Sequence, residues 1–547
     1  MDGRPPGAQN RPMNAPRSVL VLLAAAWLAP AAPAVPAVAP LAALAGEAVP
    51  DPAAAFATLS EEDLEADLVY LASPALQGRD SPSAGLDAAA EYIAERLEAA
   101  GYEGGGADGG FLRRFSRRLP APVAERCHLA LEEQDGGAPR VFELGVDYVP
   151  VWRTAKDAAL PVTGELVVLG FGIDDRKQKY DDVTGKLRGK VVLIAEGEPR
   201  HRKKFEGPEV TSAGDLYEKL DALEQAGVAG VLVMRREPYE SVADGAGPVP
   251  FGFRHTWASW AGHRRSNPVA SSLVVLEVTP AAAEALSGED VLERVRKVDK
   301  NARPPKPVET GRMVSLAADV ELRDVPIPNV VGKLTGSDPE LADEWVVLGA
   351  HYDHVGVDPR GRVGAGADDN ASGTAALLEI AEALAADPPR RSVLVCAFAA
   401  EEDGLVGSKA LVDDPPVPVD RMAAMLNMDM VGRGKASEVV VLGTEQNPKL
   451  ARLLPEARKL AKTGVKTIVT GKGQDLFQRS DHYSFHAAGV PALFFFEGLP
   501  ISDNEDYHTW RDTLDLVDID KVFNTTRLVF NTAWLLANRD ERPPPPR

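Results

Sequence analysis

Cysteine is scarce in this chain, with only Cys127 and Cys396 among 547 residues. Two cysteines cannot build a disulfide framework, and a cysteine-based zinc site needs more ligands than they offer. Cys396 lies inside the apolar run 393–398, which is typical of a small buried hydrophobic residue. Any metal ion bound by this protein must therefore be held by histidine and carboxylate side chains.

Positive charge is also in deficit, because the formal net charge is −21 and the isoelectric point is near 5.0. This charge argues against a nucleic-acid partner, since its phosphates would be repelled. A negative field attracts cationic groups instead, including the free amine of a peptide.

No hydrophobic run is long enough for a confident membrane span. The apolar stretch from Val19 to Pro30 is short and interrupted by proline. Arginines at positions 4, 11 and 17 precede it, and the small-x-small pattern Ala43-Leu44-Ala45 follows it. This order predicts a signal peptide over residues 1–45, export to the periplasm or the extracellular space, and no stable span after cleavage. An uncleaved N-terminal anchor is the alternative.

The length of the chain favours two or three domains. We expect an N-terminal helical part over 52–140, a β-rich insert over 141–290, an α/β domain over 325–538 and a disordered, proline-rich tail over 539–547. Helices are predicted over 60–71 and 85–100 from apolar spacing and a serine cap. In the α/β domain, near-continuous apolar strands alternate with helices, which predicts a mostly parallel sheet covered on both faces. The predicted strands are Trp345–Leu348, Ser392–Phe398, Met422–Met428, Val439–Leu442 and Ala492–Phe496.

Polar clusters follow several of these strands. They are His351-Tyr352-Asp353-His354, the loop from Gly366 to Gly373, Glu401-Glu402 and Asp429. Ligands bind beyond the carboxyl ends of strands in open α/β sheets, so the clusters are expected to converge. Histidine mixed with carboxylates favours zinc over magnesium or calcium. Of the two adjacent glutamates, one can bind metal while the other acts as a base.

These motifs, together with Asn427-Met428-Asp429-Met430 and Asp506-Tyr507-His508-Thr509, resemble peptidase family M28 and occur in the order of that family. The resemblance covers about Leu64–Gly106 and Pro326–Leu536, and it implies the zinc-dependent exopeptidase fold. It further implies two zinc ions, peptide substrates and hydrolysis by a water that the metals activate.

The resemblance also implies roles for single residues. His351 and Asp429 would bind one zinc, Glu402 and His508 the other, and Asp368 would bridge them. Glu401 would be the general base, and Asp353 would orient His351. Asp369 would follow the bridging position.

Further residues are expected near the site. We interpret His354 as a residue of the pocket wall. Asp481 and His482 either support the metal site or pair with each other, and Tyr507 either contacts substrate or packs. Relatives often carry proline after the His-Thr pair, whereas this chain has Trp510-Arg511-Asp512. The departure concerns the local backbone and not the ligand His508.

The insert resembles a protease-associated domain in the segments 180–194 and 223–233. This resemblance implies a cover or a recognition surface rather than chemistry. The aromatic, basic loop over 251–260 either faces substrate or serves in domain packing.

The leading hypothesis is an aminopeptidase. A carboxypeptidase or a glutaminyl cyclase of the same fold would use the same ligands, although the insert disfavours the cyclase. A binding or receptor homologue without catalysis is a further alternative, disfavoured because every ligand position holds a competent residue. The sequence does not determine the oligomeric state.

Overall fold

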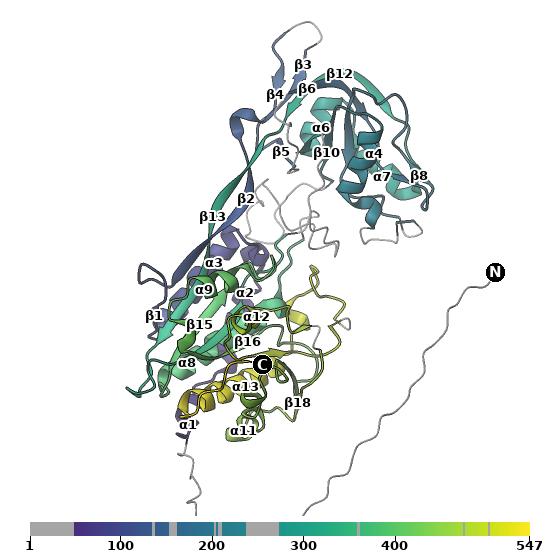
Figure 1. Ribbon diagram of the computed structural model, residues 1–547. Helices are drawn as coiled ribbons and strands as arrows, with labels where there is room; N and C mark the ends of the chain where they lie inside the picture. Colours follow the sequence, from purple (N-terminus) through teal and green to yellow (C-terminus); the bar gives the residue numbers. More distant parts are fainter. Residues whose placement is uncertain are drawn as a thin grey trace, which may run out of the picture. The chain divides into compact units, whose positions relative to one another are not determined.

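The computed structural model describes residues 49–546, except for 134–136, 152–160, 202–203, 206–210, 237–272, 358–361, 474–475 and 502–503. The described residues form two large β-sheets, each with its own hydrophobic cores (Figure 1). The predicted signal peptide and the loop over 251–260 lie outside the described residues. Among those described, no helix has both the length and the apolar character needed to cross a membrane.

The N-terminal helices share their core with the larger sheet. Ser60 accepts a hydrogen bond from the backbone N–H of Asp63 at 3.1 Å, which caps the second helix as its sequence predicts. The helices are α1 (Ala53–Phe56), α2 (Glu61–Leu71) and α3 (Ala84–Ala99). Leu64, Leu68 and Leu71 of α2 are fully buried in the same cluster as the strands of that sheet. This part of the chain is therefore integral to the larger sheet's unit.

The larger sheet has nine strands, in the order β1-β13-β15-β14-β16-β19-β17-β18, with β2 paired to β13. Its four central strands β15, β14, β16 and β19 are parallel, as predicted, and β13 and β17 run antiparallel to their neighbours β15 and β19. The bounds are β1 Glu103–Gly104, β2 Leu112–Pro122, β13 Val320–Leu334, β14 Trp345–His351, β15 Ser392–Phe398, β16 Met422–Met428, β17 Glu438–Leu442, β18 Thr467–Val469 and β19 Ala492–Phe496.

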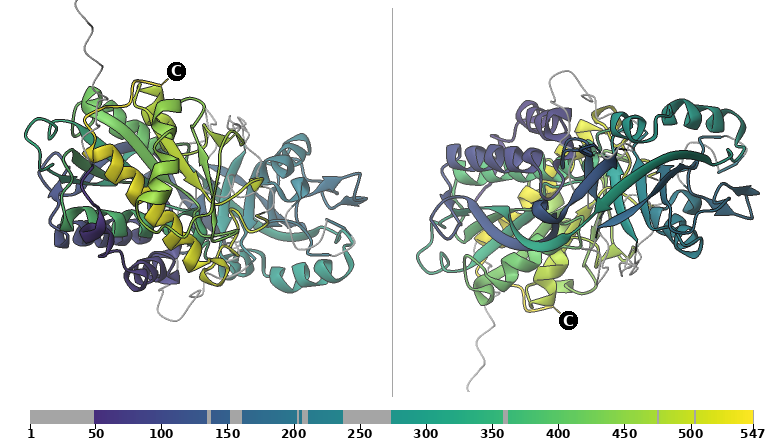
Figure 2. Two further views of the ribbon diagram at one scale, coloured as in Figure 1. Left: turned by 90° about the horizontal axis from the view of Figure 1, so that it is seen from below. Right: turned by 90° about the horizontal axis from the view of Figure 1, so that it is seen from above.

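Helices cover both faces of this sheet, which explains why its strands are apolar at consecutive positions. Val346 and Leu348 of β14 face the cluster that contains α8 and α13, whereas Val347 faces the opposite cluster. Figure 2 shows α13, in yellow, crossing one face of the sheet. The helices are α8 Gly373–Ala386, α9 Val406–Asp413, α10 Pro448–Ala451, α11 Leu454–Leu460, α12 His482–Ala487 and α13 Ile519–Asn538. The predicted buried position of Cys396 is confirmed.

The insert forms a second sheet of eight strands, in the order β4-β3-β12-β6-β9-β10-β11-β5. One face packs with α6 and α7, and the other with α4. The strands are β3 His128–Glu132, β4 Arg140–Val141, β5 Tyr148–Pro150, β6 Val162–Val168, β9 Val191–Ala195, β10 Gly230–Met234, β11 Val274–Val278 and β12 Val308–Ala317. The helices are α4 Leu216–Gln225, α6 Pro280–Ser287 and α7 Val291–Asn301, and a small hairpin joins β7 (Asp174–Asp175) to β8 (Tyr180–Asp181).

The bounds of the insert differ from those predicted over 141–290. The strands β3 and β12 lie outside that range, yet they pair antiparallel within the second sheet. The structured insert therefore extends from about residue 128 to residue 317. The ribbon of β2 and β13 leads from it into the larger sheet (Figure 1).

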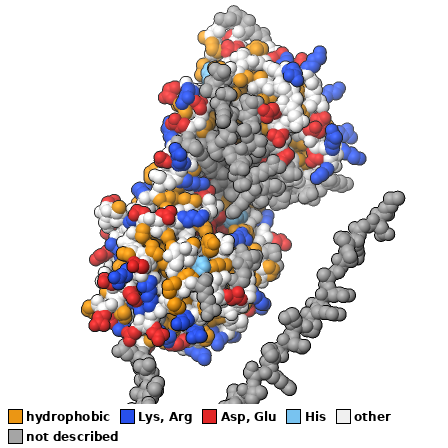
Figure 3. All heavy atoms as spheres, viewed as in Figure 1, with side chains coloured by type: hydrophobic (Ala, Val, Ile, Leu, Met, Phe, Trp, Pro, Cys, Tyr) orange, Lys and Arg blue, Asp and Glu red, His pale blue; other side chains and the backbone are white. Residues whose placement is uncertain are grey.

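The tail also differs from the predicted disorder. Arg391 donates hydrogen bonds to the carbonyls of Arg539 and Asp540, and Arg542 donates to the carbonyls of Asp420 and Met422. These arginines fix the chain beyond α13, and the structure describes it to residue 546. On the face shown in Figure 3, acidic and basic side chains are intermingled over the described residues.

Candidate metal centre

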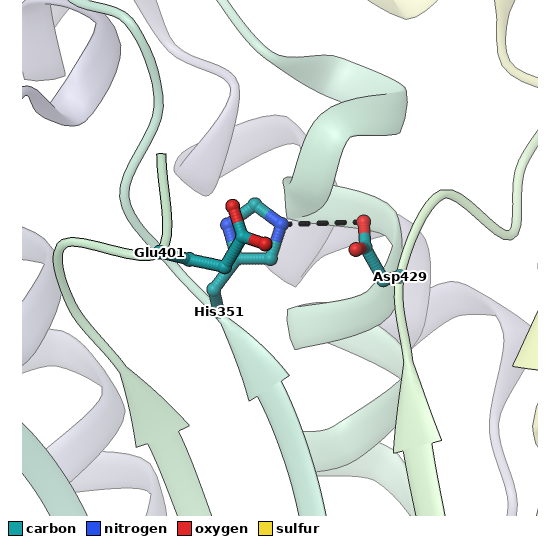
Figure 4. A group of neighbouring side chains, drawn as sticks. All are labelled: His351, Glu401 and Asp429. Atoms are coloured by element: carbon teal, nitrogen blue, oxygen red, sulfur yellow. Dashed lines mark hydrogen bonds and ion pairs between the residues drawn. The ribbon is translucent and has the colours of Figure 1, made fainter. Parts of the chain in front are cut away.

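A first group of side chains meets at the carboxyl ends of three parallel strands. His351 is the last residue of β14, Glu401 lies three residues after β15, and Asp429 directly follows β16. The three side chains point toward one another (Figure 4), and the His351 Nε2 lies 3.2 Å from the Asp429 Oδ1. Each offers one ligand atom within 4.8 Å of the others. The sequence prediction that these strand ends converge is confirmed.

A second group lies beside the first and consists of His354, Asp369 and Glu402. The His354 Nδ1 is 3.0 Å from the Glu402 Oε1. The His508 Nε2 lies 2.9 Å from the other Glu402 oxygen, so two imidazoles flank this one carboxylate. His354 thus contacts a predicted ligand directly, which is closer than the pocket-wall position expected for it.

Asp369 belongs to the second group but also contacts a residue of the first. Its Oδ1 is 3.4 Å from the His351 Nε2, and its Oδ2 is 3.2 Å from the His508 Nε2. The sequence analysis assigned the bridging position to Asp368. In the structure the next residue, Asp369, faces the ligands of both groups instead. The Asp368 carboxylate instead accepts a hydrogen bond from the Gly432 N–H at 2.7 Å. Within the turn Ala367–Ser372 the backbone of Asp369 leaves the helical conformation (φ −107°, ψ 90°), so its side chain points in a different direction from that of Asp368.

Asp512 holds this loop in place, and the sequence analysis missed it. Its two carboxylate oxygens accept the backbone N–H groups of Asp368 and Asp369, each at 3.0 Å. The burial of Asp512 and the nearby charge of Asp368 raise its pKa to about 7. The only sequence feature that pointed to this segment was its departure from the family pattern at Trp510.

Asp353 connects His351 to the two glutamates. Its carboxylate accepts the backbone N–H of Glu401 at 3.1 Å and that of Glu402 at 3.4 Å, and it lies 3.6 Å from the His351 Nδ1. The Asp353 carboxylate therefore contacts both the predicted metal ligand His351 and the backbone of the predicted base Glu401.

The remaining predicted residues line the surroundings. His482 stacks on Phe494 with ring centroids 4.8 Å apart, and burial lowers its pKa to about 3. Neither of its ring nitrogens makes a hydrogen bond to a described residue, so it does not pair with Asp481. Asp481 is fully buried, and burial raises its pKa to about 7 although nearby His351 opposes the rise. The ring of Tyr507 stacks on that of His508 at 3.8 Å.

The two adjacent glutamates have opposite electrostatic environments. Burial raises the pKa of Glu401 well above its usual value, and the neighbouring Glu402 adds to the rise although His351 opposes it. Burial also acts on Glu402, but His508 and His354 together hold its pKa well below the usual range. Two acids pushed apart in this way are suited to different tasks: one exchanges protons and the other stays ionised.

The donor set fits divalent metal ions. Buried carboxylates are stable only with a counter-charge, and here they converge on one another and on three histidines. A mixture of imidazole nitrogens and carboxylate oxygens is the environment that zinc accepts. The Asp369 carboxylate lies between the two groups, which matches the need for a shared ligand when two ions lie side by side.

Comparison with known proteins gives a consistent result. Residues 329–533 match the model of Peptidase family M28. A probable leucine aminopeptidase of Trichophyton verrucosum is 31% identical over 209 residues, which are 36% of this chain and 56% of that protein. A probable zinc metalloprotease of Pyrenophora tritici-repentis is 27% identical over 338 residues, or 54% of this chain and 73% of that protein. The chain therefore spans just over half the length of such leucine aminopeptidases. A solved zinc aminopeptidase from Bacillus subtilis has 22% identity and a TM-score of 0.47, over 90% of this chain and 97% of that one.

Proposed function

Because residues 329–533 match the model of peptidase family M28, we propose that the chain is a two-zinc aminopeptidase that releases N-terminal residues from peptides. The observation that carries the proposal is the position of Asp369 between two groups of ligand atoms. The names of similar proteins, probable leucine aminopeptidase and probable zinc metalloprotease, support the same reaction class.

The ligands divide into two sets. His351 and Asp429 would hold one zinc, Glu402 and His508 the other, and Asp369 both. When bound, zinc lowers the pKa of a water toward neutrality and polarises a carbonyl group. His354 would keep its hydrogen bond to Glu402 and so fix the direction of that carboxylate, because the 3.0 Å contact leaves the other Glu402 oxygen for the metal.

Glu401 would carry the proton. Its carboxylate would take a proton from the attacking water and return it to the nitrogen of the leaving amine. Catalysis of this kind is most efficient when the pKa of the group lies near the working pH. The raised pKa of Glu401 is in the favourable direction, and Asp353 fixes its backbone through the N–H.

The acidic surroundings favour a substrate amine over a substrate carboxylate. Asp353 and Glu401 are acidic but are not proposed ligands, so they would add negative charge beyond the carboxylates that the zinc ions neutralise, and this charge attracts a cationic N-terminus more than an anionic C-terminus. The insert would act as a protease-associated recognition domain, and the N-terminal segment would direct export. These two parts of the proposal rest on the sequence patterns alone.

The test is hydrolysis of a panel of aminoacyl-arylamides beside the same residues N-acetylated, with zinc content determined on the same sample. We expect two zinc ions per chain, cleavage of the free-amine series only, and loss of activity with a chelator. Cleavage of the acetylated series, or of C-terminal peptides and glutaminyl substrates instead, would contradict the aminopeptidase. A protein that binds no zinc after zinc is added back would point to a non-catalytic homologue.

A further inference from the structure

Arg79 is a fully buried arginine outside the segment that matches the peptidase family. It ends the short helix Pro74–Arg79, between α2 and α3. The turn is packed against the metal-site loops: a Cβ on the neighbouring Gly78 would lie 2.4 Å from the carbonyl oxygen of Gly364. A charged side chain in such a place needs partners for its donors.

The guanidinium of Arg79 donates to four backbone carbonyls. Its Nε bonds the carbonyl of Tyr352 at 2.6 Å, one residue after His351. Its Nη atoms bond the carbonyls of Ala365 at 2.9 Å and Gly366 at 3.0 Å, just before the two aspartates of the loop. The fourth acceptor is the carbonyl of Leu71 at the end of α2. The same side chain thus ties the segment of one predicted ligand, His351, to the loop of another, Asp369.

The backbone of this turn repeats the connection. The N–H of His354 donates to the Arg79 carbonyl at 3.2 Å, and the N–H of Gly356 donates to the Gly78 carbonyl at 3.1 Å. The segment after β14 is therefore hydrogen-bonded both to the side chain of Arg79 and to the backbone of its turn. Four carbonyl acceptors exceed the three donors of a lysine ammonium, whereas the planar guanidinium carries five N–H donors in a fixed fork.

The charge of Arg79 also faces the site. Burial lowers its pKa to about 10, and the carboxylates of Asp353, Asp512, Asp369 and Glu402 act against that fall. The guanidinium thus stays charged at neutral pH. Its hydrogen bonds to the described residues all go to carbonyl oxygens, so its positive charge acts on the nearby group of carboxylates rather than on one partner in an ion pair.

We propose that Arg79 is a positioning residue of the two-metal site: its guanidinium fixes the spacing between the His351 and Asp369 segments and supplies a permanent positive charge behind the converging carboxylates. The inference rests on the proposed function, because it assumes that these residues bind zinc. It assigns to the N-terminal helical part a direct effect on the metal centre.

The test compares Arg79→Met, Arg79→Lys and a matched control, Arg96→Met, in the full-length chain. Arg96 also joins the N-terminal helices to the larger unit, but through ion pairs with Asp67 and Glu382, and it bonds no residue of the metal centre. Zinc affinity is measured by competition with a chelator, and Tm is measured with and without zinc.

We expect Arg79→Met to weaken zinc binding by roughly 10–100-fold, the usual effect of losing a partner that supports metal ligands. Arg79→Lys keeps the charge without the fork and is expected to fall between the wild type and Arg79→Met. Arg96→Met is expected to lower Tm while zinc affinity stays within about twofold of the wild type. The zinc-induced rise in Tm should shrink only in the Arg79 variants.

Equal zinc affinity in Arg79→Met and the wild type would overturn the inference. So would an equal loss in Arg96→Met at the same Tm, since the effect would then be general destabilisation. If Arg79→Met does not fold, Arg79→Lys decides: wild-type affinity in it contradicts the role of the fork. A wild type that binds zinc but cleaves no peptide would contradict the proposed function and leave this comparison of affinities intact.

Discussion

The two sheets of this protein bury acids in contrasting ways. In the insert, Asp182 is fully buried, and its carboxylate accepts the N–H groups of Phe171 and Ile173 and the hydroxyl of Tyr180. Beyond the larger sheet, the buried acids Glu401, Glu402 and Asp369 lie against one another and against histidines instead. Burial raises the pKa in both regions, at Asp182 as at Glu401.

The difference lies in the partners of the acid. Three nearby donors satisfy Asp182, so its carboxylate closes a turn and needs no metal ion or other added cation. The acids of the larger sheet converge without enough donors of their own, which is stable only with added positive charge. A buried acid with a raised pKa is therefore a functional candidate only where its neighbours are also titratable and several strands deliver them to one place.

The largest loss of activity is expected from Glu401→Gln, which tests whether the buried acids of the larger sheet are functional. The amide keeps the shape of the side chain but cannot accept a proton, so kcat should fall by about 10²–10⁴-fold. Zinc content and Tm should stay close to those of the wild type, because Glu401 is not among the proposed ligands. Steady-state kinetics beside metal analysis measures both. Activity near the wild-type level would refute the role of Glu401.

A second pair of variants compares the adjacent acids Asp368 and Asp369. Asp369→Asn should lose at least one of the two zinc ions and most activity, since its carboxylate lies between the two groups. Asp368→Asn should keep both ions, because the amide oxygen can still accept the Gly432 N–H. Metal content after dialysis separates the two. The reverse pattern would restore Asp368 as the bridging ligand.

The two aspartates also show which features of the site could be predicted from the sequence. The strands were predictable because continuous apolar runs require a sheet covered on both faces, and polar residues directly after them had to meet at one edge. That logic predicts that His351 and Asp429 meet at one edge of the sheet, and their side chains lie 3.2 Å apart. It does not decide which of two adjacent aspartates turns inward, because the direction depends on the loop backbone.

The supporting residues were not predictable for a related reason. Asp512 bonds backbone groups 144 residues away, and Arg79 bonds carbonyls more than 270 residues away. Neither contact leaves a local pattern in the sequence. The ends of the insert were misjudged in the same way, because β3 and β12 pair across a long stretch of chain.

A smaller effect is expected from Asp182→Asn in the insert. The amide presents N–H donors where the carboxylate accepted three, so one or more buried donors lose their partner. Stability of the insert should fall by about 1–3 kcal/mol. Hydrogen exchange of residues 171–182 should become faster, while kcat on short arylamides stays within about twofold of the wild type. A large loss of kcat with intact zinc would break the separation between the two regions.

The last effect concerns Asp67, a buried acid in the larger unit whose two hydrogen bonds both go to the same carboxylate oxygen, in contrast to Asp182 in the insert. It bonds Tyr92 and Arg96, and burial raises its pKa from 3.8 to about 6. The folded state therefore holds the proton more tightly than the unfolded state between pH 4 and pH 6. The free energy of unfolding must then fall as the pH rises through that window, by at most about 1.4 kcal/mol per pH unit.

Asp67→Asn removes this titration, so the difference in Tm between the wild type and the variant isolates it. The wild type should lose stability relative to the variant from pH 4 to pH 6, and the difference should be constant above that range. The titration of the metal-site acids cancels in the comparison because both proteins share them. A difference that does not vary with pH would show that Arg96 and Tyr92 fully offset the burial of Asp67, although they bond only one of its two carboxylate oxygens.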